Sequence, residues 1–366
     1  MRVLQVINSL GTGGAEKLIL DVIPKYNSLG LQVDVLLLWN NDHIFTQQLI
    51  NSNCCKVFIL NNSTNIKDIY KASNVFGIRR IMRDYDIVHV HLFPAQYLVG
   101  LANLGLGKKL IFTEHSTTNN RMSSKVLSMI DKYSYKFFTR IVSISDDVTK
   151  VLNKYLKDKS KIFQIENGVD LNRIANAGSY KKSEISSDIF ENDILIAQVS
   201  AFRKGKDQKT VVKALKYLPD NYKLLLIGDG SEDEKNSVKL LVKELSLEKR
   251  VLLLGNRSDV PSLIKSTDIN VLSSEFEGLS LSSVEGLASG KPFIASKVPG
   301  LVDVVEGAGI LFELGNEKQL ASIIAELMNN RNYYNQTVLS SQERAKRYDI
   351  NVMVDHHIKL YERVYA

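Results

Sequence analysis

The sequence predicts an α/β protein with two Rossmann-like domains that face a ligand cleft. Two observations predict this class. Short apolar runs alternate with helix-like segments along the whole chain, and a polar stretch at 172–192 interrupts the alternation once. A length of 366 residues suits two domains of ordinary size. We therefore expect an N-terminal domain over 1–170 and a C-terminal domain over 190–347, joined by the polar stretch.

Each apolar run of the first half is expected to form one strand of a parallel sheet. The expected strands are 3–7, 33–38, 56–60, 87–90, 110–113, 140–144 and 162–164. Helix-like segments fall between them at about 15–29, 66–83, 95–104, 124–138 and 146–156. Strands that alternate with crossover helices are the pattern that builds parallel sheets.

The same alternation resumes after the polar stretch. The expected strands are 194–199, 223–227, 251–254, 269–272, 292–295 and 310–312. The expected helices are 208–217, 232–246, 260–265, 281–289, 301–306, 317–329 and 333–347. The end of the chain, 351–366, is one more expected helix, and we expect it to pack back on the N-terminal domain.

Composition excludes several classes of protein. No apolar run approaches the ~18 residues of a membrane-spanning helix. The chain passes from Met1 directly into an expected strand, and its two cysteines, Cys54 and Cys55, are adjacent and lack metal-ligand spacing. We therefore expect a cytoplasmic protein. The net charge of +7 suits an anionic partner, but no nucleic-acid motif is present, so nucleic acid is the least favoured one.

A basic and aromatic segment at 121–140 has two interpretations. Its arginines and lysines alternate with tyrosines and phenylalanines, as in a helix that lies on an anionic membrane surface. An ordinary helix with its aromatic residues in the core and its lysines outside has the same pattern. The sequence leaves both open, and with them a peripheral association with the inner membrane face.

The most informative motif is a pair of glutamates, Glu277 and Glu285, in a loop-to-helix segment that follows the strand at 269–272. Ligands bind at the carboxyl ends of strands in open α/β sheets. Gly278 allows backbone to approach a ligand closely. Three serines are expected to cap the helix: Ser280, Ser282 and Ser283. Carboxylates accept hydrogen bonds from hydroxyl groups, so the pair suits a sugar and a ribose.

This arrangement resembles the Glu-x7-Glu motif of the retaining glycosyltransferases of family 4 (glycosyl transferases group 1), which are two-domain GT-B type enzymes. The resemblance implies a nucleotide-sugar donor, and we expect no cofactor. It implies that Glu277 and the backbone of Gly278, Leu279 and Ser280 hold the donor sugar, and that Glu285 binds the ribose.

Two glycines after the first strand, Gly13 and Gly14, open the first expected helix and can cradle a phosphate. The third glycine of a dinucleotide-binding fingerprint is replaced by Glu16, which disfavours an NAD enzyme. The segment resembles the Gly-Gly-Ala-Glu loop of the family, which implies a place near the donor diphosphate.

Histidines end two strands of the first half. His115 matches the active-site histidine of the family, which contacts the donor sugar, and it could donate a hydrogen bond to a sugar hydroxyl or to a phosphate. His89 and His91 are expected to alternate across their strand, so that they do not both face the cleft. His91, at the strand end, is the expected acceptor-side residue.

A cationic loop follows the first strand of the second half and suits a diphosphate leaving group. Lys206 matches the lysine of the family pattern, but Ala201 stands where the family has an arginine. We expect Arg203 or Lys204 to supply the missing charge.

Two later turns resemble those that hold the nucleotide base in the family. They place Gly228, Asn256 and Arg257 on the donor side. Asp84 and Asp86 have the spacing of an Asp-x-Asp metal site, but they border an expected strand at a helix end, where capping explains them. No metal is expected.

These residues predict a metal-independent hexosyltransferase that moves a hexose or N-acetylhexosamine from a nucleotide sugar, expected to be UDP-linked, to a saccharide. His115, Glu277 and Lys206 are the expected catalytic residues, and a lipid-linked acceptor in cell-surface polysaccharide synthesis is the expected setting. Two alternatives stay open: a nucleotide-sugar-binding protein without activity, which Ala201 favours, and a nucleotide-sugar epimerase of similar shape. The motifs do not specify the sugar, the linkage or the oligomeric state.

Overall fold

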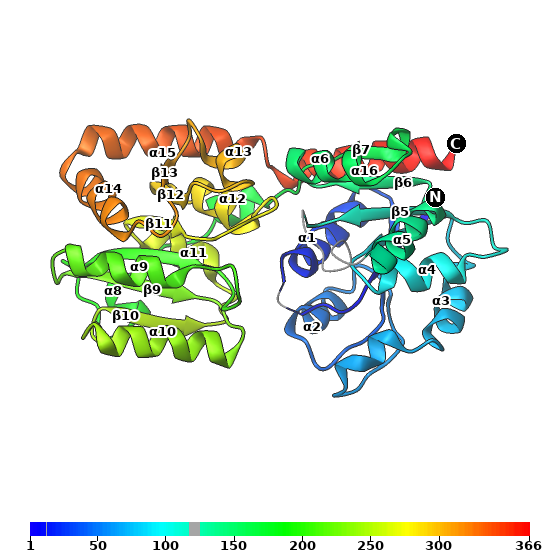
Figure 1. Ribbon diagram of the computed structural model, residues 1–366, viewed down its shortest axis with the longest axis horizontal. Helices are drawn as coiled ribbons and strands as arrows, with labels where there is room; N and C mark the ends of the chain where they lie inside the picture. The colour runs from blue at the N-terminus through cyan, green and yellow to red at the C-terminus, as the bar shows by residue number, and fades with distance from the viewer. Residues whose placement is uncertain (12, 117–124) are drawn as a thin grey trace. The chain divides into compact units, whose positions relative to one another are not determined.

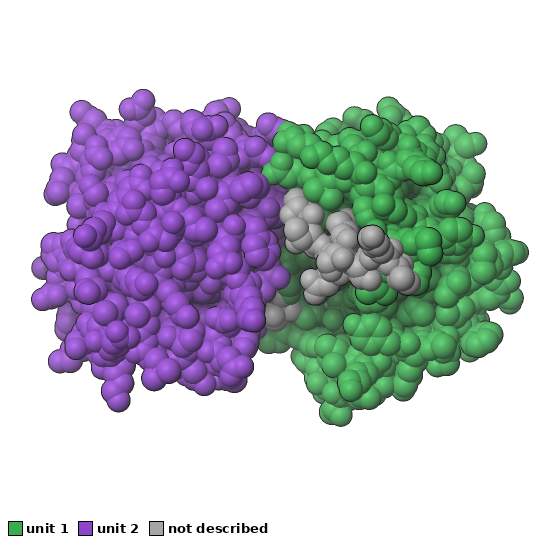
Figure 2. All heavy atoms as spheres, in the orientation of Figure 1, with its two compact units in different colours: residues 1–168, 350–366 green, residues 169–349 purple. Residues whose placement is uncertain are grey.

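The computed structural model describes residues 1–11, 13–116 and 125–366. They form two compact units, coloured separately in Figure 2. Unit 1 comprises Met1–Gly168 with Ile350–Ala366, and unit 2 comprises Val169–Asp349. The polar stretch expected to be a connection is instead part of unit 2, where it contains two short helices, α7 (Leu171–Ala175) and α8 (Lys182–Ile185).

Within the described ranges, unit 1 is built on a seven-stranded parallel sheet in the order β3-β2-β1-β4-β5-β6-β7. Its strands are β1 (Arg2–Ile7), β2 (Gln32–Leu37), β3 (Val57–Ile59), β4 (Ile87–His91), β5 (Lys109–Glu114), β6 (Arg140–Ser143) and β7 (Ile162–Gln164). β1, β2 and β4 are almost entirely buried because crossover helices cover them, as Figure 1 shows.

The helices of unit 1 follow the expected order with two differences. They are α1 (Gly14–Ser28), α2 (Ile44–Asn51), α3 (Asn74–Met82), α4 (Ala95–Ala102), α5 (Lys125–Ser134) and α6 (Asp146–Tyr155), with 3-10 turns η1 (Ile66–Tyr70), η2 (Tyr135–Phe137) and η3 (Lys159–Lys161). The helix α2 was not predicted, because it buries only Thr46 and Leu49 and so lacks a clear apolar period. The single helix expected over 66–83 is broken, since the Asn74 amide donates to the carbonyl oxygens of Asp68 and Ile69.

Unit 2 has a six-stranded parallel sheet in the order β10-β9-β8-β11-β12-β13. Its strands are β8 (Ile194–Val199), β9 (Tyr222–Ile227), β10 (Val251–Gly255), β11 (Ile269–Leu272), β12 (Phe293–Ser296) and β13 (Ile310–Phe312). Its remaining helices are α9 (Gln208–Ala214), α10 (Glu232–Glu244), α11 (Val260–Ser266), α12 (Leu281–Ala288), α13 (Leu301–Val305), α14 (Glu317–Asn329) and α15 (Arg331–Lys346), with the 3-10 turn η4 (Leu215–Tyr217). Two apolar clusters pack against this sheet.

The strand order of each sheet reverses once. In unit 1 the reversal lies between β1 and β4, and in unit 2 between β8 and β11. At such a switch point the loops that leave adjacent strands run in opposite directions and leave room for a ligand. Gly13, Lys206 and Glu277 lie in loops that leave β1, β8 and β11, and His91 is the last residue of β4. The topology therefore places these four predicted site residues at the switch points of their own units.

The C-terminal helix α16 (Ile350–Tyr365) belongs to unit 1 and packs on α1 and β4. Its His357 Nδ1 forms a hydrogen bond with the Tyr26 hydroxyl at 2.7 Å, and its Tyr361 is completely buried. The last helix therefore completes the core of unit 1 with one buried face, while its other face is exposed (Figure 1).

Candidate functional site

Hydrogen bonds join two loops at the switch point of unit 2. The Asp207 amide donates to the Ser273 carbonyl at 3.1 Å, and the Ser273 hydroxyl donates back to the Asp207 carboxylate at 2.8 Å. The Glu275 amide and the Ser274 hydroxyl both donate to the Gly205 carbonyl at 2.8 Å. These hydrogen bonds hold the loop after β8 against the loop after β11.

This junction pairs Lys206 with Glu277. The Lys206 ammonium contacts the Glu277 carboxylate, and the two side chains are only 9% and 8% exposed. Burial lowers the pKa of Lys206, while the charge of Glu277 acts in the opposite direction. The structure therefore brings together the residues predicted for the diphosphate and for the sugar, as a buried ion pair.

Glycines let the backbone of this junction pack closely. A Cβ on Gly205 (φ +87°) would lie 2.6 Å from the Phe276 ring. A Cβ on Gly300 (φ +80°) would lie 2.2 Å from the Gly278 carbonyl and 2.4 Å from that of Glu277. Gly300, in the turn between β12 and α13, therefore packs against the backbone of the loop that carries Glu277. Sequence reasoning missed it, and the Pro-Gly turn after β12 was the only available signal.

The helix α12 begins differently from the prediction. Ser280 is its N-cap residue, but no side-chain capping bond forms, so the expected capping by serine hydroxyls is wrong. The Ser280 and Ser282 hydroxyls bond each other at 3.1 Å, and the Ser283 hydroxyl donates to the Ser280 carbonyl at 2.7 Å. Leu279 is buried, while Glu285 is half-buried on the second turn.

Three other residues of the cationic loop are exposed. Ala201, Arg203 and Lys204 all face solvent. The positive charge of Arg203 contributes to lowering the pKa of Lys206, so these two cations lie near each other. Gly228 (φ +137°) lies against this loop, and its Cβ would meet the Ser200 carbonyl at 2.3 Å. Close packing alone thus requires glycine at 228.

The turn after β10 carries the last two predicted donor residues. Asn256 is exposed. The Arg257 guanidinium forms a two-pronged ion pair with Asp259 at 2.8 and 2.6 Å, and the Tyr180 hydroxyl also donates to Asp259 at 2.8 Å. Arg257 lowers the pKa of Asp259 to about 2. Asp259 therefore already engages the Arg257 side chain.

In unit 1, Gly13 is the N-cap residue of α1 and Gly14 is its first residue. A Cβ on Gly13 would lie 2.3 Å from the Glu16 carboxylate, which folds back over the start of the helix. Residue 12 lies outside the described residues. The helix N-terminus, expected to receive a phosphate, thus has a carboxylate of its own beside it.

The histidines lie on one face of the unit 1 sheet. His91 ends β4 and His115 follows β5, and His91 Nδ1 lies 3.0 Å from His115 Nε2. The rings of His89 and His91 are 4.5 Å apart. The expectation that these two alternate across the strand is wrong, because residues i and i+2 of a strand point to the same face. Burial lowers the pKa of His115 to about 4.

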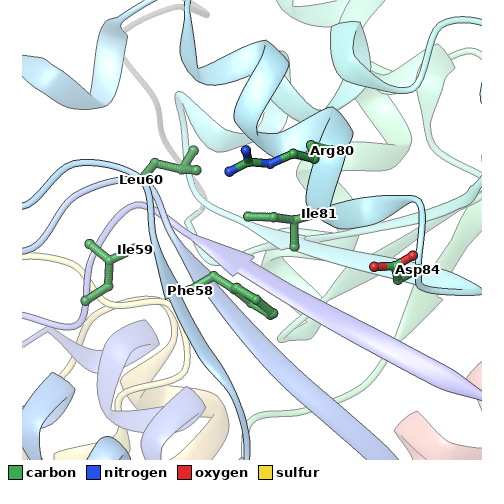
Figure 3. A pocket seen from close by; sticks show the side chains of 6 residues that line it. All are labelled: Phe58, Ile59, Leu60, Arg80, Ile81 and Asp84. Atoms are coloured by element: carbon green, nitrogen blue, oxygen red, sulfur yellow. The ribbon is translucent and has the colours of Figure 1, made fainter.

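No group of three or more potential metal ligands occurs in the described ranges 1–11, 13–116 and 125–366. A pocket of about 320 Å³ lies in unit 1 between the edge strand β3 and α3, as Figure 3 shows. It is lined by Phe58, Ile59, Leu60, Arg80, Ile81 and Asp84. None of the predicted site residues lines it.

Comparisons with known proteins agree with this fold and these loops. Residues 12–173 match the model of Glycosyltransferase Family 4, and residues 180–345 match that of Glycosyl transferases group 1. A UDP-Gal:alpha-D-GlcNAc-diphosphoundecaprenol alpha-1,3-galactosyltransferase of Escherichia coli is 28% identical, over 70% of this chain and 69% of the relative. An N-acetylgalactosamine-N,N'-diacetylbacillosaminyl-diphospho-undecaprenol 4-alpha-N-acetylgalactosaminyltransferase of Campylobacter jejuni is 24% identical, over 94% of each chain.

Among solved structures, Anabaena HepE in complex with UDP and glucose superposes with a TM-score of 0.86, at 21% identity and 99% coverage of both chains. The two matched models adjoin, and together they include both switch-point loops of unit 2 and both histidine-bearing strands of unit 1. With two parallel Rossmann-like sheets and the glutamate motif at a switch point, this chain belongs to the family 4 glycosyltransferases of group 1 and has the GT-B fold.

Proposed function

We propose that this protein is a retaining glycosyltransferase that moves a hexose or N-acetylhexosamine from a UDP-sugar to a lipid-linked saccharide in cell-surface polysaccharide synthesis. The observation that carries the proposal is the buried Lys206–Glu277 pair at the switch point of unit 2. The relatives from Escherichia coli and Campylobacter jejuni, whose names specify diphospho-undecaprenol acceptors, support the acceptor class. The HepE complex with UDP supports the donor class.

In this proposal the ion pair exchanges partners when the donor binds. The diphosphate takes the Lys206 ammonium, which frees the Glu277 carboxylate to accept a hydrogen bond from a sugar hydroxyl. As the bond from the sugar to the diphosphate breaks, negative charge grows on the leaving group. Lys206, Arg203 and the N-terminus of α12 stabilise that charge without a metal ion. The acceptor hydroxyl oxygen bonds to the sugar carbon on the face from which the diphosphate leaves, and the hydroxyl proton passes to the departing diphosphate.

Changes at the two glutamates test the assignment of donor parts. Glu285→Ala should weaken UDP binding roughly ten- to a hundredfold, the equivalent of a lost charged hydrogen bond. Glu277→Ala should retain UDP binding and lose most transfer, because UDP lacks the sugar that Glu277 is proposed to contact. Titration calorimetry with UDP and a transfer assay with a UDP-sugar measure these effects, and EDTA should leave transfer unchanged. Loss of transfer on chelation, restored by Mg²⁺, would refute the metal-free mechanism.

The same assay separates the alternatives. A protein that binds UDP-sugars but transfers and hydrolyses none of them across a set of acceptors is a binding protein. One that converts the donor sugar without an acceptor is an epimerase.

Arg203 and Lys204 are a matched pair for locating the second cation. Both are exposed and adjacent, so each substitution costs little stability. Because Arg203 acts electrostatically on Lys206, we expect Arg203→Ala to approach the transfer defect of Lys206→Ala and Lys204→Ala to remain near wild type. Near-normal transfer by Arg203→Ala would leave Lys206 as the main cation.

We further propose a peripheral contact of α5 with anionic lipid. The described part of this helix exposes four large apolar side chains: Leu127, Met129, Ile130 and Tyr133. Lys132 and Lys136 are exposed beside them, whereas the aromatic residues Tyr135 and Phe138 are buried. Apolar residues flanked by lysines suit a membrane interface. Arg121, which was part of the predicted segment, lies outside the described residues.

Among the described helices, none has the length and apolar character needed to cross a bilayer. Flotation with vesicles tests the contact. The protein should float with anionic vesicles, and a smaller fraction should float at high salt. The double variant Met129→Ser/Ile130→Ser should no longer float with them. Leu240→Ser is the control, since Leu240 on α10 is 69% exposed, like Met129 at 67%. Equal and weak binding to neutral and anionic vesicles would contradict the contact.

A further inference from the structure

A chain of hydrogen bonds runs from His115 through the interior of unit 1 to the C-terminal helix. His115 Nε2 lies 3.0 Å from His91 Nδ1, and His91 Nε2 lies 2.7 Å from Gln5 Oε1. The nitrogen of the same amide, Gln5 Nε2, donates to the Tyr361 hydroxyl at 2.9 Å. Gln5, His91 and Tyr361 are almost fully buried, so water does not compete for these contacts.

The Gln5 amide gives this chain a direction. An amide oxygen only accepts hydrogen bonds, so His91 carries its proton on Nε2. The Nδ1 of a neutral His91 is then bare and accepts from the Nε2–H of His115. A neutral His115 with its proton on Nε2 has a bare Nδ1. A reversed amide would reverse each bond and place an N–H at that position.

Tyr361 holds the amide in this orientation. Its hydroxyl oxygen accepts from Gln5 Nε2, and the hydroxyl also lies 2.7 Å from His89 Nδ1. The other ring nitrogen of His89, Nε2, lies 2.7 Å from Thr113 Oγ1. We take the Tyr361 hydroxyl proton to be donated to His89 Nδ1, so that the hydroxyl offers Gln5 only an acceptor and a reversed amide oxygen would face it unpaired.

The histidines of the chain are neutral near pH 7. Burial lowers the pKa of His115 to about 4, and burial lowers those of His89 and His91 well below the ordinary value, with further lowering from the neighbouring histidines. The direction of the chain therefore decides whether the free nitrogen of His115 donates or accepts.

We propose that Gln5 and Tyr361 are positioning residues that fix His115 as its Nε2–H tautomer, so that its Nδ1 accepts a hydrogen bond from a substrate hydroxyl. The identity of that substrate as a sugar rests on the proposed function. A diphosphate oxygen, which has no proton to give at neutral pH, does not fit a bare nitrogen. His115 therefore recognises a hydroxyl of the sugar and not the phosphates.

Nitrogen NMR of ring-¹⁵N-labelled histidines tests the tautomer directly in the protein without substrate. The signal of His115, assigned by its loss in His115→Asn, should show a bare Nδ1 and a protonated Nε2. Tyr361→Phe removes the oxygen that holds Gln5 and should shift both signals toward the average of the two tautomers. A protonated Nδ1 in the wild type, or an unchanged His115 in Tyr361→Phe, would overturn the proposal.

Kinetics give the second measurement. Tyr361→Phe should lower kcat for transfer about five- to tenfold, the equivalent of one hydrogen bond, and leave UDP affinity unchanged because UDP lacks the sugar that is transferred. Tyr85→Phe is the matched control, since it removes another buried hydroxyl of unit 1, one that donates to Asp34 at 2.7 Å. It should change neither readout. The NMR experiment needs no transfer assay. Absence of transferase activity would therefore refute the proposed function, whereas the tautomer of His115 would still be known from the NMR signals.

Discussion

Lys206 and Glu277 contact each other in the structure, although their sequence motifs predict that they contact different parts of the donor. The motifs assign the lysine to the diphosphate and the glutamate to the sugar, whereas the structure joins them in one buried ion pair. Two charges taken out of water stabilise each other, and removal of either leaves the other uncompensated. A single substitution at either position therefore changes stability as well as ligand contact.

A double-mutant cycle separates these two effects. Lys206→Met or Glu277→Gln alone should destabilise unit 2 by about 3–5 kcal/mol, because each leaves a buried partner unpaired. The double variant should lose less stability than the sum of the two single losses. Calorimetric unfolding of the four proteins measures the coupling. Strictly additive losses would mean that the pair contributes no coupling energy.

At the scale of elements, the glutamate loop is shaped by the turn that precedes α13. Gly300 has a positive φ, and its Cα lies so close to the carbonyls of Glu277 and Gly278 that a Cβ has no space. The loop after β11 is therefore positioned from both sides, by Gly205 on the β8 side and by Gly300 on the β12 side.

Alanine substitutions at two glycines separate backbone strain from this contact. Gly315 has nearly the same φ as Gly300 (+76° against +80°), but a Cβ there meets nothing within 4 Å. Gly315→Ala should cost about 1–2 kcal/mol of stability and leave transfer unchanged. Gly300→Ala should cost more stability and reduce transfer at least tenfold, because the Glu277 backbone must move. Equal transfer by the two variants, in assays at a temperature where both are folded, would refute the supporting role.

At the scale of the whole molecule, α16 returns the end of the chain to the core of unit 1. His357 and Tyr361 contact Tyr26 and His89, which belong to elements near the start of the chain. Burial lowers the pKa of His357 to about 3, with further lowering from His115. The core of this unit therefore contains several histidines that are held neutral.

Unit 1 should lose stability as the pH falls. Unfolded histidines bind a proton near pH 6.5, whereas folded His115 resists until about pH 4, so the unfolded state binds more protons in this window. The lowered pKa has no effect well above pH 6.5. At ~1.4 kcal/mol per pKa unit, His115 alone should cost about 2 kcal/mol by pH 5.

Trp39, the only tryptophan of the chain, lies in unit 1, so urea unfolding followed by its fluorescence reports on this unit. A urea midpoint that stays constant from pH 7 to pH 5, or a His115 ring that titrates near pH 6.5, would contradict the expectation.

Apolar periodicity predicted the strands of both sheets to within one or two residues, since a strand buried on both faces must be apolar throughout. It did not predict α2, which buries little, or the break before α3, which a single asparagine amide causes. In the site, resemblance to family motifs predicted Lys206, Glu277 and His115, and position at a strand end predicted His91; their roles stay predictions.

The sequence by itself therefore determined the family, the succession of strands along the chain and the residue types near the strand ends, because each of these depends on local pattern. The tertiary structure decided the partners: Lys206 with Glu277, Gly300 with the Glu277 backbone, and His115 with His91, Gln5 and Tyr361. Tyr361 lies 356 positions from Gln5 in the chain. No local pattern encodes such contacts, since they arise only when the sheet and the last helix have packed together.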